Sequence, residues 1–408
     1  PVKLWLTADI PAGTAPGEYE GTVTVKSGGE VQLTFTVRLL VVNHALPPVS
    51  EWAFHLDLWQ FPFQLSGLCA DNGQKVTPFS SEYFTLVKPF YQLLADAGQK
   101  VITAYIKDGA FNKGQTMVKW HEAADGKWSF DYTGFDKFVA QMMSWGIGRQ
   151  ISCFSLVGWN TSIGYTDASG EARTLKLTVG SDEYRTVWNE FLDSFERHLK
   201  TKGWFEKTVL YMDEIREDEM RQVVSFIKQH NPDWKIGLAG SAVSSDVESA
   251  FYDYSTILGY DRTSTNAVAT FYTSCAQSIP NAYVSLDNNP AEMVWVAWYA
   301  KAKGLNGFLR WAYDYWTKAD PQDVRDGSNT AGDFSLIYRS DNSLSSVPLS
   351  SIRLELLREG IQDYEKMRIL STNLMNPVVQ KFTLTSGRFA GEIVTEAQGM
   401  LKKISAEY

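Results

Sequence analysis

The chain has 408 residues, of which 44% are hydrophobic and 21% charged, a composition typical of a folded globular protein. The formal net charge is -9 and Lys and Arg are not clustered, so nucleic acid is not an expected partner. No apolar run approaches the roughly 20 residues of a transmembrane segment, and the length favours one large domain with an appendage over a minimal barrel of roughly 250 residues.

Residues 1–46 are β in character. Three β-branched segments, separated by turn sequences rich in Gly and Pro, predict strands over 2–10, 19–25 and 31–42. Three strands cannot close a sandwich, so we expect the C-terminal portion of a β-sandwich domain whose earlier strands precede Pro1. Pro47 and Pro48 then form a stiff linker.

From residue 51 onward, short apolar segments alternate with longer amphipathic ones, which indicates a βα series. The expected strands are 52–59, 101–106, 149–156, 208–213, 235–240, 255–260, 268–275 and 307–313. Helices are expected at 82–97, 134–145, 183–201, 217–230, 291–303, 351–370 and 390–405. The pattern predicts an α/β fold, a (β/α)8 TIM-like catalytic barrel over 47–372 with a helical extension over 373–408 packed on it. A doubly wound sheet is the alternative, although no Gly-rich phosphate loop opens a helix.

An acid pair at the end of one expected strand is the strongest candidate for catalysis. In the segment TVLYMDEIRED, residues 208–218, an apolar strand stops at Asp213 and Glu214. Neighbouring side chains on a strand point to opposite faces, so both acids reach one ligand only where the strand ends. The C-terminal rim of a barrel is such a place. The alternative is structural, with Asp213 capping the following helix and Glu214 in its first turn.

The other strand ends offer aromatic and acidic side chains that would complete a pocket. The first expected strand alternates His55, Asp57 and Trp59 on one face, and a buried His and Asp are costly unless paired. Further candidates at strand ends are Tyr260, Asp261, Tyr272, Trp311, Tyr313, Asp314 and Trp316. Asp, Tyr and Trp together are typical of a saccharide site, whereas any one ring is more often explained by core packing than by ligand binding.

Other chemistries lack their motifs. The five histidines have no metal-ligand spacing, and there is no GxSxG sequence of a serine hydrolase. The three cysteines are far apart, and Cys153 and Cys275 lie in apolar strand segments, where we interpret them as small buried hydrophobes. We therefore expect neither a metal nor an organic cofactor.

Several longer motifs follow one another along nearly the whole chain: PGEYEGTVTV (16–25), FHLDLWQ (54–60), LADAGQKVITA (94–104), YMDE (211–214), LRWAY (309–313), AGD (331–333) and SIRLELLREGIQDYEKMRIL (351–370). With these motifs the chain resembles glycoside hydrolase family 123, the retaining β-N-acetylgalactosaminidases and their bacterial relatives. The resemblance implies a β-sandwich followed by a (β/α)8 barrel, in agreement with the pattern of elements.

The resemblance also implies an activity. It indicates an exo-acting enzyme that releases terminal β-linked GalNAc from glycolipid or glycan substrates. The 2-acetamido oxygen of the substrate would act as the nucleophile and form an oxazolinium intermediate. Asp213 would orient and stabilise the acetamido group, and Glu214 would be the general acid and then the base.

Two alternatives stay open at this point. One is a glycosidase for another sugar with a conventional carboxylate nucleophile such as Asp57, and the other is a non-catalytic carbohydrate-binding protein. Residue types do not distinguish GalNAc from GlcNAc, because the two sugars differ in one hydroxyl orientation. Given the expected substrate and upstream sandwich, we expect a secreted, periplasmic or cell-surface location in a bacterium, although no signal is visible in this chain.

Overall fold

A parallel sheet forms the centre of the computed structural model, which describes residues 5–11, 13–108, 115–260, 265–325 and 330–407. Within these residues it has eight strands, in the order β3-β14-β13-β12-β11-β10-β7-β4. Their bounds are β3 (His55–Leu58), β4 (Val101–Tyr105), β7 (Gln150–Phe154), β10 (Thr208–Asp213), β11 (Lys235–Gly240), β12 (Asp253–Ile257), β13 (Val268–Tyr272) and β14 (Gly307–Arg310). The expected TIM-like α/β fold is confirmed.

The two edge strands of this sheet approach each other and nearly close it into a barrel. Leu56 of β3 forms an isolated parallel bridge with Gln99, just before β4. The backbone N–H of Lys100 donates to the carbonyl of Leu56 at 3.0 Å. The carboxyl ends of all eight strands therefore gather at one rim.

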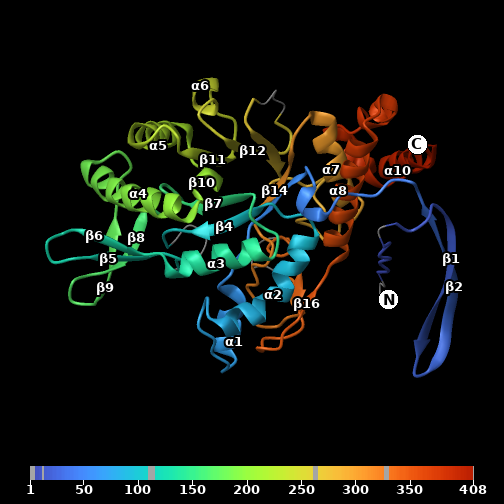
Figure 1. Cartoon of the computed structure of the whole chain (residues 1–408), viewed down its shortest axis with the longest axis horizontal. Coiled ribbons are helices and arrows are strands. Elements are labelled where there is room, and N and C mark those ends of the chain that lie inside the picture. Colours follow the sequence, from blue (N-terminus) through green and yellow to red (C-terminus); the bar gives the residue numbers. More distant parts are fainter. Residues whose placement is uncertain (1–4, 12, 109–114, 261–264, 326–329, 408) are drawn as a thin grey trace.

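Helices surround the sheet (Figure 1), and within the described residues the seven expected from the sequence are accompanied by three shorter ones that were not expected. They are α1 (Gln64–Asp71), α2 (Ser81–Asp96), α3 (Thr133–Ser144), α4 (Asp182–Lys202), α5 (Glu217–His230), α6 (Ser245–Glu248), α7 (Glu292–Lys303), α8 (Ile352–Leu370), α9 (Asn376–Val379) and α10 (Ala390–Glu407), with short 3-10 turns η1 (Val49–Glu51), η2 (Phe205–Lys207), η3 (Asn373–Met375) and η4 (Leu384–Phe389). Local chemistry sets several ends, because the side chains of Ser80, Ser181 and Ser351 each accept a backbone N–H at an N-cap. None of the helices in the described segments is long and apolar enough to span a bilayer.

A second sheet, which the sequence did not predict, extends from the barrel. Its strands are β5 (Lys119–Glu122), β6 (Trp128–Asp131), β8 (Ser162–Thr166) and β9 (Ala172–Lys176), in the order β6-β5-β8-β9. They come from the connections after β4 and β7, and the two hairpins meet where His121 pairs with Thr166. Figure 1 shows this sheet at the end of the molecule opposite β1 and β2. A further short pair joins β15 (Tyr338–Arg339) to β16 (Pro348–Leu349).

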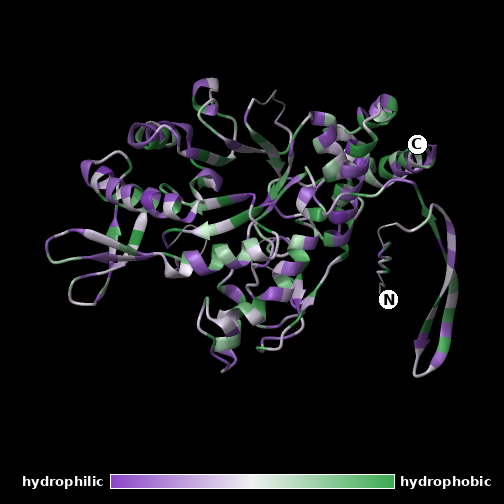
Figure 2. Cartoon of the chain, viewed as in Figure 1, coloured by the Kyte–Doolittle hydropathy of each residue, from purple (hydrophilic) through white to green (hydrophobic). Residues whose placement is uncertain are grey.

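The N-terminal segment forms a long hairpin of β1 (Gly17–Ser27) and β2 (Glu30–Val41), which lies apart from the barrel in Figure 1. Hydrophobic and hydrophilic residues alternate along it, as Figure 2 shows, so one face is apolar. The expected strand over 2–10 was wrong for its described part, since residues 5–10 are not a strand. The assignment of 1–46 to a sandwich domain stays a prediction. At the other end of the chain, α10 packs against α7 and α8.

Candidate active site

A cavity of about 460 Å³ opens at the carboxyl ends of the barrel strands. Its lining consists of Trp59, Trp159, Asp213, Glu214, Ala239, Ile257, Tyr272, Ser274, Cys275, Ala276, Leu309, Arg310, Trp311, Asp333 and Phe334. Aromatic walls with a few converging charged groups are the composition of a small-molecule site. A second cavity, of about 410 Å³ between β2, α8 and α10, has no Trp, Tyr or Phe among the described residues that line it.

The backbone brings both acids into the first cavity. Strand β10 ends at Asp213, and Glu214 has a φ of 49°, in the left-handed region that non-glycine residues rarely adopt. The N–H of Glu214 nevertheless donates to the carbonyl of Ala239 at 2.7 Å, so the ladder to β11 continues through the turn. Such a conformation costs on the order of 1 to 3 kcal/mol and occurs often at functional sites. Both carboxyl groups therefore line one cavity, although they are neighbours on the chain.

The two acids have different surroundings. Burial raises the pKa of Asp213 well above its ordinary value, the adjacent Glu214 charge raises it further, and the Arg310 guanidinium opposes both effects. Glu214 is exposed to the cavity, where its Oε1 accepts a hydrogen bond from the Tyr272 hydroxyl at 3.1 Å. The Trp159 indole N–H donates to the backbone carbonyl of Asp213 at 3.2 Å. Asp213 is thus fixed through its backbone, and Glu214 is held by a side-chain donor.

The Tyr272 hydroxyl gives a test of this orientation. A side-chain hydrogen bond contributes about 0.5 to 1.5 kcal/mol, so we expect Tyr272→Phe to lower kcat by up to roughly tenfold with little change in KM. The measurement is steady-state kinetics on an aryl β-N-acetylgalactosaminide, the type of substrate that the resemblance implies. A change confined to KM would mean that Tyr272 contacts only bound sugar and does not position Glu214.

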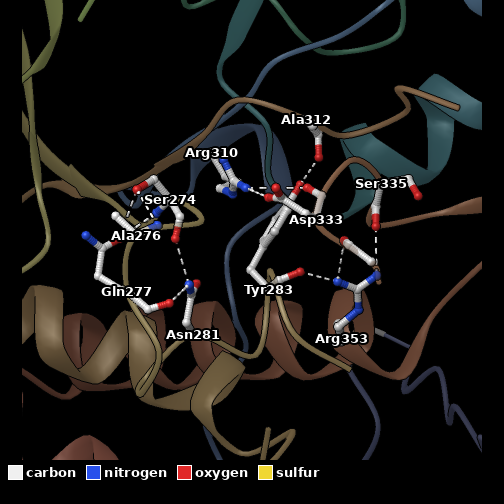
Figure 3. A network of polar contacts seen from close by, with 11 residues as sticks. Ser274, Ala276, Gln277, Asn281, Tyr283, Arg310, Ala312, Asp333, Ser335 and Arg353 are labelled. Carbon is white, nitrogen blue, oxygen red and sulfur yellow. Dashed lines mark hydrogen bonds and ion pairs between the residues drawn. The ribbon is translucent and has the colours of Figure 1, made fainter. Parts of the chain in front are cut away.

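A buried ion pair forms another part of the wall. Arg310, the last residue of β14, and Asp333 are each only 1% exposed, and the guanidinium contacts the carboxylate directly. The same guanidinium lies 5.2 Å from the centre of the Tyr283 ring and 5.5 Å from that of Trp311. Figure 3 shows that Arg353 lies next to this group, where it donates to backbone carbonyls of the chain around Asp333. Arg310 therefore sits in a position fixed on several sides.

The loop after β13 is held by its own polar contacts (Figure 3). The Asn281 amide donates to the carbonyls of Ser274 at 2.8 Å and Gln277 at 2.7 Å, and the Ser274 N–H donates to the Gln277 side chain at 2.6 Å. Cys275 lies on this loop and is exposed at the cavity. The expectation that Cys275 is a buried hydrophobe was therefore wrong, because β13 ends at Tyr272, before the cysteine.

Among the residues expected at the site, Trp59, Asp213, Glu214, Tyr272 and Trp311 line the cavity. The Trp311 ring meets Phe334 edge to face at 5.0 Å, and the Trp59 ring meets Phe154 in the same way at 4.9 Å. These contacts hold the two indoles as rigid walls.

His55 and Asp57 do not line the cavity. Both are buried inside the barrel, where Trp59 donates to Asp57 at 3.4 Å and His55 lies 4.0 Å from Asp253. Burial and the charges of Arg149 and Lys100 lower the pKa of His55 to about 3, so the imidazole is neutral and the approach to Asp253 is not an ion pair. His55, Asp57 and Trp59 alternate along one face, as expected. Because β3 ends at Leu58, only Trp59, the residue after the strand, reaches the rim.

The candidates after β14 also lie elsewhere. The Tyr313 hydroxyl donates to the carbonyl of Phe90, and the Trp316 indole to that of Ile337 at 2.9 Å. Both rings are buried in the wall of the barrel, because the strand stops at Arg310 and the chain turns away. Tyr260 is partly exposed beside Phe271 and Lys303, outside the cavity. Asp261 lies outside the described residues.

Asp314 is a buried structural acid. Its carboxylate accepts the backbone N–H of Phe61 at 2.8 Å and the Tyr91 hydroxyl at 3.2 Å, which joins the ends of β14 and β3 to α2. Burial raises the pKa of Asp314 to about 7. Because the folded chain holds this proton more tightly than the unfolded chain, the carboxyl destabilises the fold progressively between about pH 4 and about pH 7.

We therefore expect Asp314→Asn to reduce the loss of stability on raising the pH. The measurement is the free energy of unfolding in urea at about pH 5 and about pH 8 for both proteins. The wild type should lose more stability over this interval than the variant. Equal losses would show that Asp314 does not titrate in this window.

Arg310, Asp333 and Trp159 are among the cavity residues that sequence reasoning did not single out. Arg310 lies in the apolar segment GFLRWAY, where a charge needs a buried partner, so its presence there was a usable signal. Asp333 ends the AGD motif of the family resemblance, but its place in the cavity, like that of Trp159, depends on how the connections fold.

Comparison with known proteins places this arrangement in a family. Residues 65–370 match the family described as glycoside hydrolase 123, catalytic domain. The chain belongs to glycoside hydrolase family 123. It is similar to a family 123 glycoside hydrolase from Clostridium perfringens whose structural analysis addressed glycolipid glycan hydrolysis, with 25% identity, a TM-score of 0.83 and coverage of 97% of this chain and 76% of that one. The chain matches none of the curated proteins in sequence.

As a family 123 glycoside hydrolase, the protein acts on glycosidic bonds, and the resemblance seen in the sequence is confirmed. The match covers β4 to β14, whose carboxyl ends supply most of the cavity. The acid pair, the ion pair of Arg310 with Asp333 and the aromatic walls all lie within these matched residues, apart from Trp59.

Proposed function

We propose that the protein is an exo-acting, retaining β-N-acetylgalactosaminidase that removes terminal β-linked GalNAc from glycolipids or other glycans. The observation that supports this most is the adjacent pair Asp213 and Glu214, with both carboxyl groups in one cavity. An ordinary retaining pair flanks the scissile bond with carboxyl groups about 5 to 5.5 Å apart, one of them a nucleophile. Asp213 and Glu214 are neighbours at one strand end, and this arrangement suits a mechanism in which the substrate supplies its own nucleophile.

In the first step the 2-acetamido oxygen attacks the anomeric carbon while the bond to the leaving oxygen breaks. Glu214 donates its proton to that oxygen, so the leaving group departs as an alcohol. Asp213, as a carboxylate, accepts a hydrogen bond from the acetamido N–H and stabilises the positive charge of the oxazolinium. A tethered nucleophile can have an effective molarity of roughly 10⁵ to 10⁸ M, which accounts for the absence of a protein nucleophile from this scheme.

In the second step a water molecule attacks the anomeric carbon from the face that the leaving group left. Glu214, now a carboxylate, takes a proton from this water, and the oxazolinium ring opens to restore the acetamido group. Two inversions at the anomeric carbon give net retention. Tyr272, which donates to Glu214 at 3.1 Å, would keep the carboxyl in place through both proton transfers.

A conventional nucleophile is less well supported by the geometry. Asp57 is buried within the barrel and is not in the lining of the cavity. Asp333 is in the lining, but it is committed to the ion pair with Arg310. Of the lining carboxyl groups in the described chain, Asp213 and Glu214 are therefore the ones suited to act on substrate.

The proposal is tested by comparing three aryl glycosides that share one leaving group. We expect hydrolysis of the β-N-acetylgalactosaminide, slower hydrolysis of the β-N-acetylglucosaminide, and none of the β-galactoside, which has a hydroxyl in place of the acetamido group. Efficient cleavage of the β-galactoside would overturn the substrate-assisted mechanism. Binding of N-acetylgalactosamine without cleavage of any glycoside would favour a carbohydrate-binding protein.

A further inference from the structure

Trp159 stands out among the side chains of the cavity because its ring is 72% exposed. It lies in the connection between β7 and β8, at residues 155–161, and its indole N–H donates to the carbonyl of Asp213 at 3.2 Å. Trp59, which also lines the cavity, is fully buried. Trp159 therefore presents apolar surface to solvent directly beside the acid pair.

The loop that carries Trp159 is anchored. Lys107, only 1% exposed at the end of β4, directs its ammonium group to the carbonyls of Asn160 at 2.8 Å, Ser162 at 3.1 Å and Asp108 at 3.0 Å. The Asp108 carboxylate also accepts the backbone N–H of Gly164 at 2.8 Å. These bonds connect the part of the loop that follows Trp159, together with the start of β8, to the end of β4.

Burying a lysine is costly because the ammonium group loses its hydration, and the same desolvation lowers the pKa of Lys107 to about 8. Three carbonyl acceptors compensate for the lost hydration of the ammonium group. The buried ammonium group of Lys107 thus holds in place the loop that carries the exposed indole of Trp159. Because Trp159 is 72% exposed, its ring is not packed in the core, and its surface is available to a ligand.

We propose that Trp159 is the stacking platform for the leaving sugar, the residue to which the terminal N-acetylhexosamine is attached. This inference rests on the proposed function. The terminal sugar occupies the enclosed part of the cavity with Asp213 and Glu214, so the rest of the substrate extends past the mouth, where the exposed ring lies. The C–H face of a pyranose packs on an indole face, and the polar edges stay hydrated.

The test compares two substrates that share the same β-N-acetylgalactosaminyl group. One is a disaccharide with galactose as the leaving sugar, and the other is the glycosyl fluoride, which has no leaving sugar. For Trp159→Ala we expect kcat/KM to fall about tenfold more on the disaccharide than on the fluoride, where the loss reports only the missing hydrogen bond to the Asp213 carbonyl. Trp159→Phe lacks the indole N–H but keeps a ring for stacking, so its loss of kcat/KM on the disaccharide should be clearly smaller than that of Trp159→Ala.

Trp5→Ala is the matched control, because Trp5 is 45% exposed in the N-terminal segment, outside the lining of the cavity. It should leave both substrates unaffected. Equal losses on both substrates for Trp159→Ala would overturn the proposal and show that Trp159 acts by positioning Asp213 or by contacting the terminal sugar. A loss for Trp159→Phe as large as that for Trp159→Ala would overturn it as well. No loss on the disaccharide would also overturn it. A wild-type enzyme that cleaves neither substrate would overturn the proposed function itself.

Discussion

Asp213→Asn and Glu214→Gln should each lower kcat by about 10²- to 10⁴-fold, the range typical of general acid–base groups and of charge stabilisation at a transition state. The two losses should differ in kind. An amide at position 213 cannot neutralise the oxazolinium, so its effect should be similar for good and poor leaving groups. An amide at position 214 cannot protonate the leaving oxygen, so its effect should be largest for sugar leaving groups and smaller for activated aryl ones.

The matched control is Asp218→Asn. Asp218 lies in the first turn of α5, only a few residues along the chain, and its carboxylate is exposed and paired with Arg216. This variant removes an acid from the same segment without touching the cavity, so kcat should stay within about twofold of the wild type. Losses of less than about tenfold for Asp213→Asn and Glu214→Gln would contradict the assignment of the pair.

Arg310→Met should be the most destabilising change at the site. It removes the cation from a pair in which both side chains are 1% exposed, so the Asp333 carboxylate is left buried without its counter-charge. Such a loss costs about 3 to 5 kcal/mol. The measurement is the free energy of unfolding in urea, read from the transition midpoint at constant m-value.

The double variant Arg310→Met with Asp333→Leu separates the charge effect from lost packing. Because it removes both charges, it should recover a large part of the stability that Arg310→Met loses. If the double variant is less stable than Arg310→Met by the full cost of a second independent substitution, the ion pair does not account for the effect.

The same substitution should shift the pH profile of activity. Arg310 opposes the rise in the pKa of Asp213, and Asp213 must be a carboxylate to stabilise the oxazolinium. Removal of the positive charge should therefore raise this pKa further and move the acidic limb of kcat to higher pH. Arg310→Lys keeps the charge and should leave the limb near its wild-type position, provided the variant folds.

The barrel was predictable because each of its strands carries its own local signal. The segments around β4, β10 and β11 are short apolar runs bounded by turns and amphipathic helices, and each falls within a residue or so of its expected range. The sheet of β5, β6, β8 and β9 lacks that advantage. Its strands are short and partly polar, and the β5–β8 contact joins residues 121 and 166, which no local pattern relates.

The site was predictable where it coincides with the end of a strand. Asp213, Tyr272 and Trp59 follow directly from strand register. The prediction failed where the strand ended earlier than the apolar run, as at β14, so Tyr313 and Trp316 became part of the wall and Arg310 reached the cavity instead. Trp159 and Asp333 depend on loop placement, which is set by distant partners such as Lys107 and Arg310.

The most direct test of the central claim is proton NMR of the sugar first released from an aryl β-N-acetylgalactosaminide. Substrate-assisted catalysis by Asp213 and Glu214 predicts that the β-anomer appears first and that the α-anomer follows only by mutarotation. Initial release of the α-anomer would reveal a single displacement by water and contradict the oxazolinium mechanism.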